Sequence, residues 1–209
     1  MRYEIVIVTP FMQNCTLFWC EETREAVVID PGGDAPKIEK AIEKNKLNVT
    51  KILLTHGHID HAGAGLELSE KYQVEIWGPE KSDDYWLKAL PQQGRTFGIG
   101  EAPAFLPQKW LVEGDSVSFG KETLDVLHCP GHTPGHIVFV NRKDKLAQVG
   151  DVLFQGSIGR TDFAGGNFED LIASIKNKLL PLGDDFAFIS GHGPNSTIGD
   201  ERRYNPFLR

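Results

Sequence analysis

This chain has no long apolar run, no cluster of basic residues and few cysteines, and each of these features excludes a class of function or partner. No stretch of the 209 residues approaches the run of about 20 apolar residues that a membrane-spanning helix needs. The 22 basic residues form no cluster and are outnumbered by 29 acidic ones, which leaves a formal charge of −7. Because nucleic-acid binding requires positive charge against phosphates, the sequence predicts neither a membrane partner nor a nucleic-acid partner.

Cysteine is limited to Cys15, Cys20 and Cys129, an odd number at no metal-finger spacing. Cys15 and Cys20 lie in a strand-like segment and are interpreted as small packing residues. Cys129 stands between two residues of a candidate ligand loop, so a thiolate ligand there is an alternative to packing. The G-x-S-x-G motif of serine hydrolases is also missing, which argues against a serine nucleophile.

No linker or low-complexity tract interrupts the chain, and its 40% hydrophobic content is enough to bury a full core. The N-terminal apolar run over 5–8 is too short for a secretion signal and follows the acidic residue Glu4. We therefore expect a single domain over residues 1–209, located in the cytoplasm. The oligomeric state is left open.

Histidine and aspartate, in contrast, are concentrated in one short motif after the apolar run 52–54. Within six residues the motif contains three imidazoles and a carboxylate, those of His56, His58, Asp60 and His61. Adjacent side chains point apart, so the four cannot all bind one ion, but they can serve two neighbouring ions. Such ligands suit zinc, iron or manganese, and the motif predicts half of a dinuclear site. The alternative is a polar turn with solvated histidines.

Three further ligand-type residues follow apolar segments later in the chain. His132 lies among prolines and glycines in 130–135, Asp151 follows 146–150, and His192 follows 186–191. Catalytic groups gather on loops held by a rigid scaffold, so these junctions are candidates for the other half of the site. The neighbouring His128 and His136 are interpreted as structural or supporting residues.

The pattern of apolar residues predicts two β-rich halves, each with external helices, which together form an αβ/βα sandwich. Strands are expected over 3–8, 14–21, 25–29, 49–54, 116–119, 123–127, 137–140 and 146–149, and helices over 35–46, 63–72 and 168–179. The first three strands are expected to form an antiparallel meander. The irregular segment 81–110 is interpreted mainly as a helix and loop whose aromatic residues pack on the sheets. The alternative is a loop that contacts substrate.

These motifs, in this order, resemble the metallo-β-lactamase superfamily. The resemblance covers H-x-H-x-D-H, P-G-H-T, Gly150-Asp151 and Gly191-His192, and implies two mixed β-sheets flanked by helices. The segment G-S-I-G-R-T-D-F over 156–163 and the ending G-H-G-P are similar to short bacterial glyoxalase II-like hydrolases. The part G-R-T-D-F is also similar to the persulfide dioxygenases.

The resemblance implies a ligand set for two divalent ions, with zinc favoured over iron or manganese. The first ion would be held by His56, His58 and His132, the second by Asp60, His61 and His192, with Asp151 bridging the two. No catalytic group beyond a metal-bound hydroxide is then required. The implied reaction is hydrolysis of S-D-lactoylglutathione to D-lactate and glutathione. Alternatives are an iron-dependent persulfide dioxygenase, a non-catalytic domain and a β-lactamase.

Substrate binding is less well defined by the sequence. The chain ends at Arg209, without the helical C-terminal domain with which longer glyoxalase II enzymes bind glutathione, so we expect weak saturation. Arg160 is the candidate contact for a glutathione carboxylate, and a buried ion pair with Asp162 is the alternative. Asp30 would either orient a metal-bound histidine or close a turn.

Overall fold

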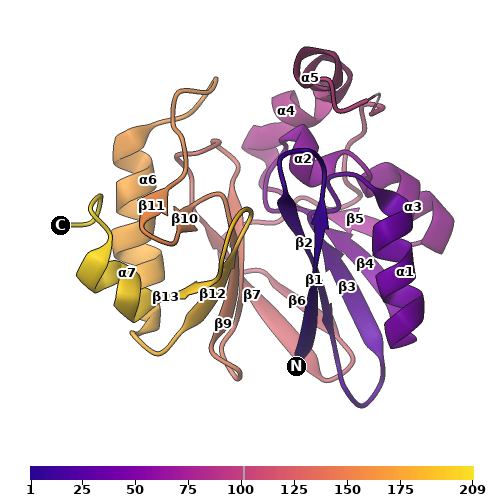
Figure 1. The fold of residues 1–209 in the computed structure, drawn as a ribbon, viewed down its shortest axis with the longest axis horizontal. Coiled ribbons are helices and arrows are strands. Elements are labelled where there is room, and N and C mark those ends of the chain that lie inside the picture. The colour runs from indigo at the N-terminus through magenta and orange to yellow at the C-terminus, as the bar shows by residue number, and fades with distance from the viewer. Residues whose placement is uncertain (101) are drawn as a thin grey trace.

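Two β-sheets stacked face to face, with helices on both outer sides, form the body of the protein (Figure 1). The computed structural model describes residues 1–100 and 102–209. The first sheet has the order β1-β2-β3-β4-β5, the second the order β13-β12-β9-β8-β7-β6, and β10 and β11 form a small hairpin. The predicted αβ/βα sandwich is therefore confirmed.

The strands are β1 (Arg2–Val8), β2 (Gln13–Trp19), β3 (Glu25–Ile29), β4 (Asn48–Leu53), β5 (Glu75–Trp77), β6 (Ser116–Phe119), β7 (Glu122–His128), β8 (Ile137–Asn141), β9 (Leu146–Gly150), β10 (Leu153–Phe154), β11 (Ser157–Ile158), β12 (Ala187–Ser190) and β13 (Ser196–Thr197). The helices are α1 (Ala35–Asn45), α2 (Ile59–Ala62), α3 (Gly65–Tyr72), α4 (Asp84–Lys88), α5 (Leu90–Phe97), α6 (Phe168–Ser174) and α7 (Ile198–Tyr204). Helices α1 and α3 cover the first sheet, and α6 and α7 cover the second (Figure 1).

The strand directions bring the candidate residues to one edge of the sandwich. Strands β1, β2 and β3 pair antiparallel, as predicted, but β3, β4 and β5 run parallel because helical crossovers connect them. In the second sheet β9 and β12 are also parallel. Parallel strands end at the same edge, so the segments after β4, β9 and β12 emerge at the ends of their sheets and carry the candidate ligands.

Three buried apolar clusters hold this arrangement. The cluster between the sheets includes Phe18 and Leu53 from the first sheet and Phe119 and Phe139 from the second, all 2% exposed or less. Two further clusters lie between each sheet and its outer helices. Burying such side chains stabilises each by about 1.5–3 kcal/mol relative to exposure, so the loops at the edge rest on a rigid base.

Several element boundaries differ from the predictions. The helix expected over 63–72 begins at Gly65, and Asp60 and His61 lie in the separate short helix α2. The helix expected over 168–179 is regular only to Ser174 and continues as a wider turn through Leu179. Strand β5 and helix α7 were not expected at all. Within the described residues, no helix is long and apolar enough to cross a membrane.

Candidate metal centre

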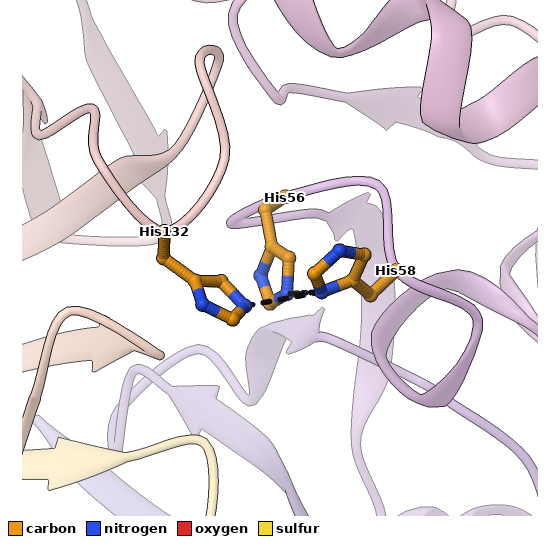
Figure 2. A group of neighbouring side chains, drawn as sticks. All are labelled: His56, His58 and His132. Carbon is orange, nitrogen blue, oxygen red and sulfur yellow. Dashed lines mark hydrogen bonds between the residues drawn. The ribbon is translucent and has the colours of Figure 1, made fainter. Parts of the chain in front are cut away.

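Three histidines from two separate loops form the first ligand group. His56 Nε2 lies 3.1 Å and His132 Nε2 3.0 Å from the Nδ1 atom of His58. Figure 2 shows the three rings turned toward one another, two from the loop after β4 and one from the loop after β7. All three side chains are buried. Three nitrogen donors so close together can hold one cation.

The second ligand group combines α2 with the loop after β12. His192 Nε2 lies 3.2 Å from Asp60 Oδ2, and His61 Nε2 lies 3.9 Å from the same oxygen. The three donor atoms lie within 4.8 Å of one another, so this group can also hold a cation. Asp60 and His61 are neighbours in the chain, and the helical turn of α2 lets both reach the same site.

Asp151, which follows β9, lies between the two groups. Its Oδ1 atom is 3.4 Å from His61 Nε2, and its Oδ2 atom is 3.6 Å from His132 Nε2 and 3.7 Å from His192 Nε2. The carboxylate thus approaches histidines of both groups. We propose on this geometry that Asp151 bridges two ions.

Unpaired buried atoms test whether these residues fit a pair of divalent ions. Among the described residues, His61 Nε2 and Asp151 Oδ1 are buried and have no hydrogen-bond partner. Leaving such an atom unpaired costs about 1–3 kcal/mol, which a bound cation would offset. Gly191 keeps this space open, because a Cβ atom there would lie 2.1 Å from Asp151 Oδ1. The residues therefore fit two divalent ions.

The protonation states of the cluster also suit metal binding. Burial lowers the pKa of His56 well below its usual range and that of His58 to about 3, which leaves both imidazoles neutral. Burial raises the pKa of Asp151, but the nearby histidines, His61 first, more than reverse this and keep it ionised. Burial likewise lowers the pKa of His61, and the carboxylates of Asp151 and Asp60 raise it well above its usual value. Positive charge is thus favoured beside the carboxylates.

Comparison with known proteins identifies the family. The model of the metallo-beta-lactamase superfamily matches residues 8–192. The chain belongs to this superfamily.

Relatives and solved structures match this chain over nearly its whole length. Hydroxyacylglutathione hydrolase GloC of Haemophilus influenzae is 50% identical over 209 residues, which cover 100% of this chain and 98% of the relative. The crystal structure of BLEG-1 B3 metallo-beta-lactamase superposes with a TM-score of 0.91 at 37% identity, covering 99% of both chains. The crystal structure of TTHA1623 in a di-iron-bound form gives a TM-score of 0.89 at 36% identity, covering 98% of this chain and 100% of that one.

Hydrogen bonds orient the histidines of this superfamily member. Asp30 accepts hydrogen bonds from His61 Nδ1 at 2.9 Å and from the backbone and hydroxyl of Thr55 at 2.7 Å each. These bonds support the first of the two roles considered for Asp30, the orientation of a histidine, and none of them closes its own turn. Because the Thr55 hydroxyl donates its hydrogen bond to Asp30, its oxygen accepts one from His56 Nδ1 at 3.0 Å. Both bonds leave the Nε2 atom facing the metal centre.

Backbone carbonyls orient two other histidines in the same way. His132 Nδ1 donates to the carbonyl of Arg160 at 2.7 Å, and His192 Nδ1 donates to that of Phe11 at 3.0 Å. The second carbonyl belongs to the turn between β1 and β2, so opposite halves of the sandwich meet at His192. These supporting atoms belong to the backbone, and no residue-type pattern in the sequence could have indicated them.

Asp83 ties the two halves of the first ligand group together and was not expected from the sequence. Its buried carboxylate accepts from Gly57 N at 2.9 Å, Gly135 N at 2.6 Å and the Thr133 hydroxyl at 2.8 Å. Burial raises the pKa of Asp83 to about 6 against the effect of these bonds. Since the donors flank His56, His58 and His132, Asp83 fixes the distance between the loops. In the sequence it looks no different from the half-buried Asp84 beside it.

His136 and Cys129, which lie near His132 in the sequence, have supporting and packing roles. His136 Nε2 accepts from the backbone of Asp151 at 3.1 Å, and its ring stacks on His56 with centroids 4.7 Å apart. Cys129 belongs to none of the ligand groups of the described residues, and burial raises the pKa of its thiol to about 12. Packing is therefore the interpretation that the structure supports for Cys129.

A cavity of 610 Å³ opens beside the metal centre, and Trp86, Gln93 and Phe97 contribute to its wall. The aromatic residues of the segment 81–110 were expected mainly to pack on the sheets, and this is wrong for Trp86 and Phe97. Phe105 and Trp110 do pack against the core, as expected. The segment therefore serves both purposes, because its first part overhangs the metal centre and its last part covers the sheet.

Arg160 lies on the same wall and also forms the ion pair considered as its alternative. Its guanidinium donates two hydrogen bonds to Asp162, at 2.9 and 2.7 Å. The expectation of a buried pair is wrong, because the two side chains are 68% and 66% exposed. Arg160 is therefore accessible to a substrate carboxylate at the rim of the cavity.

Proposed function

We propose that this chain is a dinuclear metal-dependent thioester hydrolase that converts S-D-lactoylglutathione to D-lactate and glutathione. The observation that carries the proposal is the pair of adjoining ligand groups around Asp151 at the base of a cavity. The whole-length similarity to a hydroxyacylglutathione hydrolase supports the choice of substrate. The three free, buried cysteines support a reducing, cytoplasmic location.

The residues of the chain supply position and charge for this reaction. Two adjacent divalent ions, when bound, bring the pKa of a shared water close to neutral and polarise a carbonyl oxygen. In the proposed site, His56, His58 and His132 would hold one ion, Asp60, His61 and His192 would hold the other, and Asp151 would contact both. Asp30 and Asp83 keep the ligands in place through hydrogen bonds. A thiolate leaves without strong acid assistance, so no proton donor is needed at the sulfur.

We infer zinc as the native metal. Imidazole and carboxylate donors bind zinc more tightly than ferrous iron or manganese, although metal supply in the cell also decides occupancy. The relative TTHA1623 is described in a di-iron-bound form, which makes iron the main competitor.

Two alternatives use the same site differently. An iron-dependent dioxygenase requires two histidines and one carboxylate on a single metal with open positions, and the adjoining group Asp60, His61 and His192 favours the hydrolase. The similarity to BLEG-1 B3 metallo-beta-lactamase suggests β-lactam hydrolysis as the second alternative. An amine leaves less readily than a thiolate, so we rank this reaction below thioester hydrolysis.

Thioester turnover and metal content together test the proposed function. The purified protein is expected to hold close to two ions per chain and to hydrolyse S-D-lactoylglutathione at the same rate in air and under nitrogen, since water is the only co-substrate. Elemental analysis and release of free thiol measure the two quantities. No hydrolysis at full metal loading, or a reaction that stops without oxygen, would contradict the proposal.

Arg160→Ala is expected to raise KM for S-D-lactoylglutathione roughly three- to ten-fold and to change kcat little, because an ion pair at an exposed position contributes only about 1 kcal/mol. The exposed position of Arg160 at the cavity rim fits a role in binding the thiol carrier. Arg142→Ala is the matched control, because Arg142 is also exposed and paired with an aspartate. Loss of metal or of folded protein in Arg160→Ala would instead indicate that the Arg160–Asp162 pair has a structural role.

A further inference from the structure

We propose that the cavity selects thioesters whose acyl group is apolar and about the size of an aromatic ring, in preference to the small lactoyl group. This inference rests on the proposed function and names the substrate class of the same site.

The wall of the cavity is dominated by aromatic and aliphatic side chains. Aromatic rings come from four different parts of the chain, and they are those of Phe11, Trp86, Phe97, Phe154 and Phe163. Ile59 and Ile158 add aliphatic surface. The methyl group of a lactoyl chain can cover only a small part of such a wall, and a ring can cover much more. Because apolar burial stabilises in proportion to area, the wall favours the larger apolar group.

Two of these rings lie beside the metal centre itself. The ring centroids of Trp86 and Phe163 are 4.5 and 4.8 Å from that of His58, and Phe163 is 5.5 Å from His132. The reacting carbonyl would lie at the metal centre, so the two groups bonded to it, the acyl chain and the thiol sulfur, would both lie near these rings. We assign the aromatic surface to the acyl group, because the glutathione carrier is long and polar and suits the exposed rim of the cavity. The longer thiol carrier extends outward, where the exposed Arg160 lies.

Two of the polar side chains on the wall, those of Gln93 and Arg160, have partners within the protein, whereas Gln155 and Ser157 also line the cavity. The Gln93 side chain accepts from Ile59 N and donates to the carbonyls of Gly57 and Trp86. Arg160 is paired with Asp162, and its guanidinium also lies 4.6 Å from the centre of the Phe163 ring. The Gln93 side chain is therefore not free to bind the hydroxyl of a lactoyl group. Because a mandeloyl group carries the same α-hydroxyl as a lactoyl group, polar contacts with that hydroxyl do not separate the two, and apolar contact with the wall decides the preference.

A pair of substrates that differ in one group tests this preference. S-D-mandeloylglutathione and S-D-lactoylglutathione share the thiol and the α-hydroxyl group, and differ only by phenyl in place of methyl. We expect kcat/KM of the metal-loaded wild-type protein to be about ten-fold or more higher for the mandeloyl substrate. A lactoyl thioester of phenylmethanethiol is the third substrate, and it places the ring on the thiol side instead.

Two variants connect the preference to the wall. Phe163→Ala and Phe97→Ala are each expected to reduce the mandeloyl-to-lactoyl ratio several-fold, because each removes apolar surface from the cavity. Phe168→Ala is the matched control, since this phenylalanine on α6 is as exposed as Phe97 and is not part of the cavity wall; its ratio should match the wild type.

The outcomes separate the inference from the proposed function. Equal or better use of the lactoyl substrate overturns the aromatic preference and leaves the hydrolase intact. A larger gain from the ring on the thiol side also overturns it, because the wall would then face the carrier. If the fully metal-loaded protein hydrolyses none of the three thioesters, both proposals fail.

Discussion

Replacement of Asp151 by alanine is expected to lower kcat for S-D-lactoylglutathione by on the order of 10⁴-fold, more than any single histidine substitution. The carboxylate lies within 3.7 Å of histidines from both ligand groups, so its loss affects both proposed ions and the distance between them. Elemental analysis is expected to show loss of metal from both positions. The fold should persist, because the three apolar clusters do not depend on this side chain.

Asp185→Ala provides the control for this variant. Asp185 is an exposed aspartate paired with Lys145 on the surface, and its removal should change neither kcat nor metal content. Far-ultraviolet circular dichroism of Asp151→Ala should match the wild type. A bridging role is ruled out if Asp151→Ala retains a tenth of the wild-type kcat or keeps both ions.

The candidate ligands could be predicted from the sequence, because metal binding depends on side-chain type and four of the ligands are closely spaced in the chain. His56, His58, Asp60 and His61 lie within six residues, and the structure brings them together with three residues from distant loops. The strand ends explain this convergence. Apolar runs predict buried strands, and a polar residue directly after such a run emerges at the edge of a sheet.

Side chains that hold the site by hydrogen bonds to backbone groups could not be predicted in this way. Asp83 and Gln93 hold the metal loops by bonds to backbone groups, so no pairing of residue types in the sequence points to them. Trp86 was ambiguous, because an aromatic residue in an irregular segment packs on a core or lines a cavity with the same local pattern. Its contact with His58 depends on Gly57, where a Cβ atom would lie 2.6 Å from Trp86 Cβ.

Fold prediction failed where elements were short. Strand β5 has only three residues, Glu75–Trp77, and is defined by parallel pairing with β4 more than by its own apolar pattern. Helix α7 has seven residues and is capped at its N-terminus by Thr197, whose side chain accepts a hydrogen bond from Asp200 N. Such elements carry too few residues for periodicity to be recognised, and tertiary contacts decide them.

Removal of the metal ions is expected to abolish hydrolysis and to lower the midpoint of thermal unfolding by roughly 10 °C. Two ions, each present at about thirty times its Kd, together stabilise a folded protein by about 4 kcal/mol, and a chain of this size shifts by about 2–4 °C per kcal/mol. Chelation would also leave the buried His61 Nε2 and Asp151 Oδ1 atoms without partners. Addition of zinc should restore both activity and midpoint, as followed by thiol release and calorimetry. An unchanged midpoint after complete chelation would contradict the prediction that bound metal ions stabilise the fold.

Single histidine variants then divide this effect between the two ions. His58 belongs only to the first ligand group, and His61 donates to the group formed with Asp60 and His192. We expect His58→Ala and His61→Ala each to retain about one ion and about half of the metal-dependent shift in midpoint, with activity lost in both. His128→Ala is the matched control, because this half-buried histidine bonds to the carbonyl of Pro134 and belongs to no ligand group of the described residues; it should keep both ions. A wild-type protein that holds a single tightly bound iron, with the same metal content and midpoint in His61→Ala, would favour a mononuclear site, since only the first group would then hold metal.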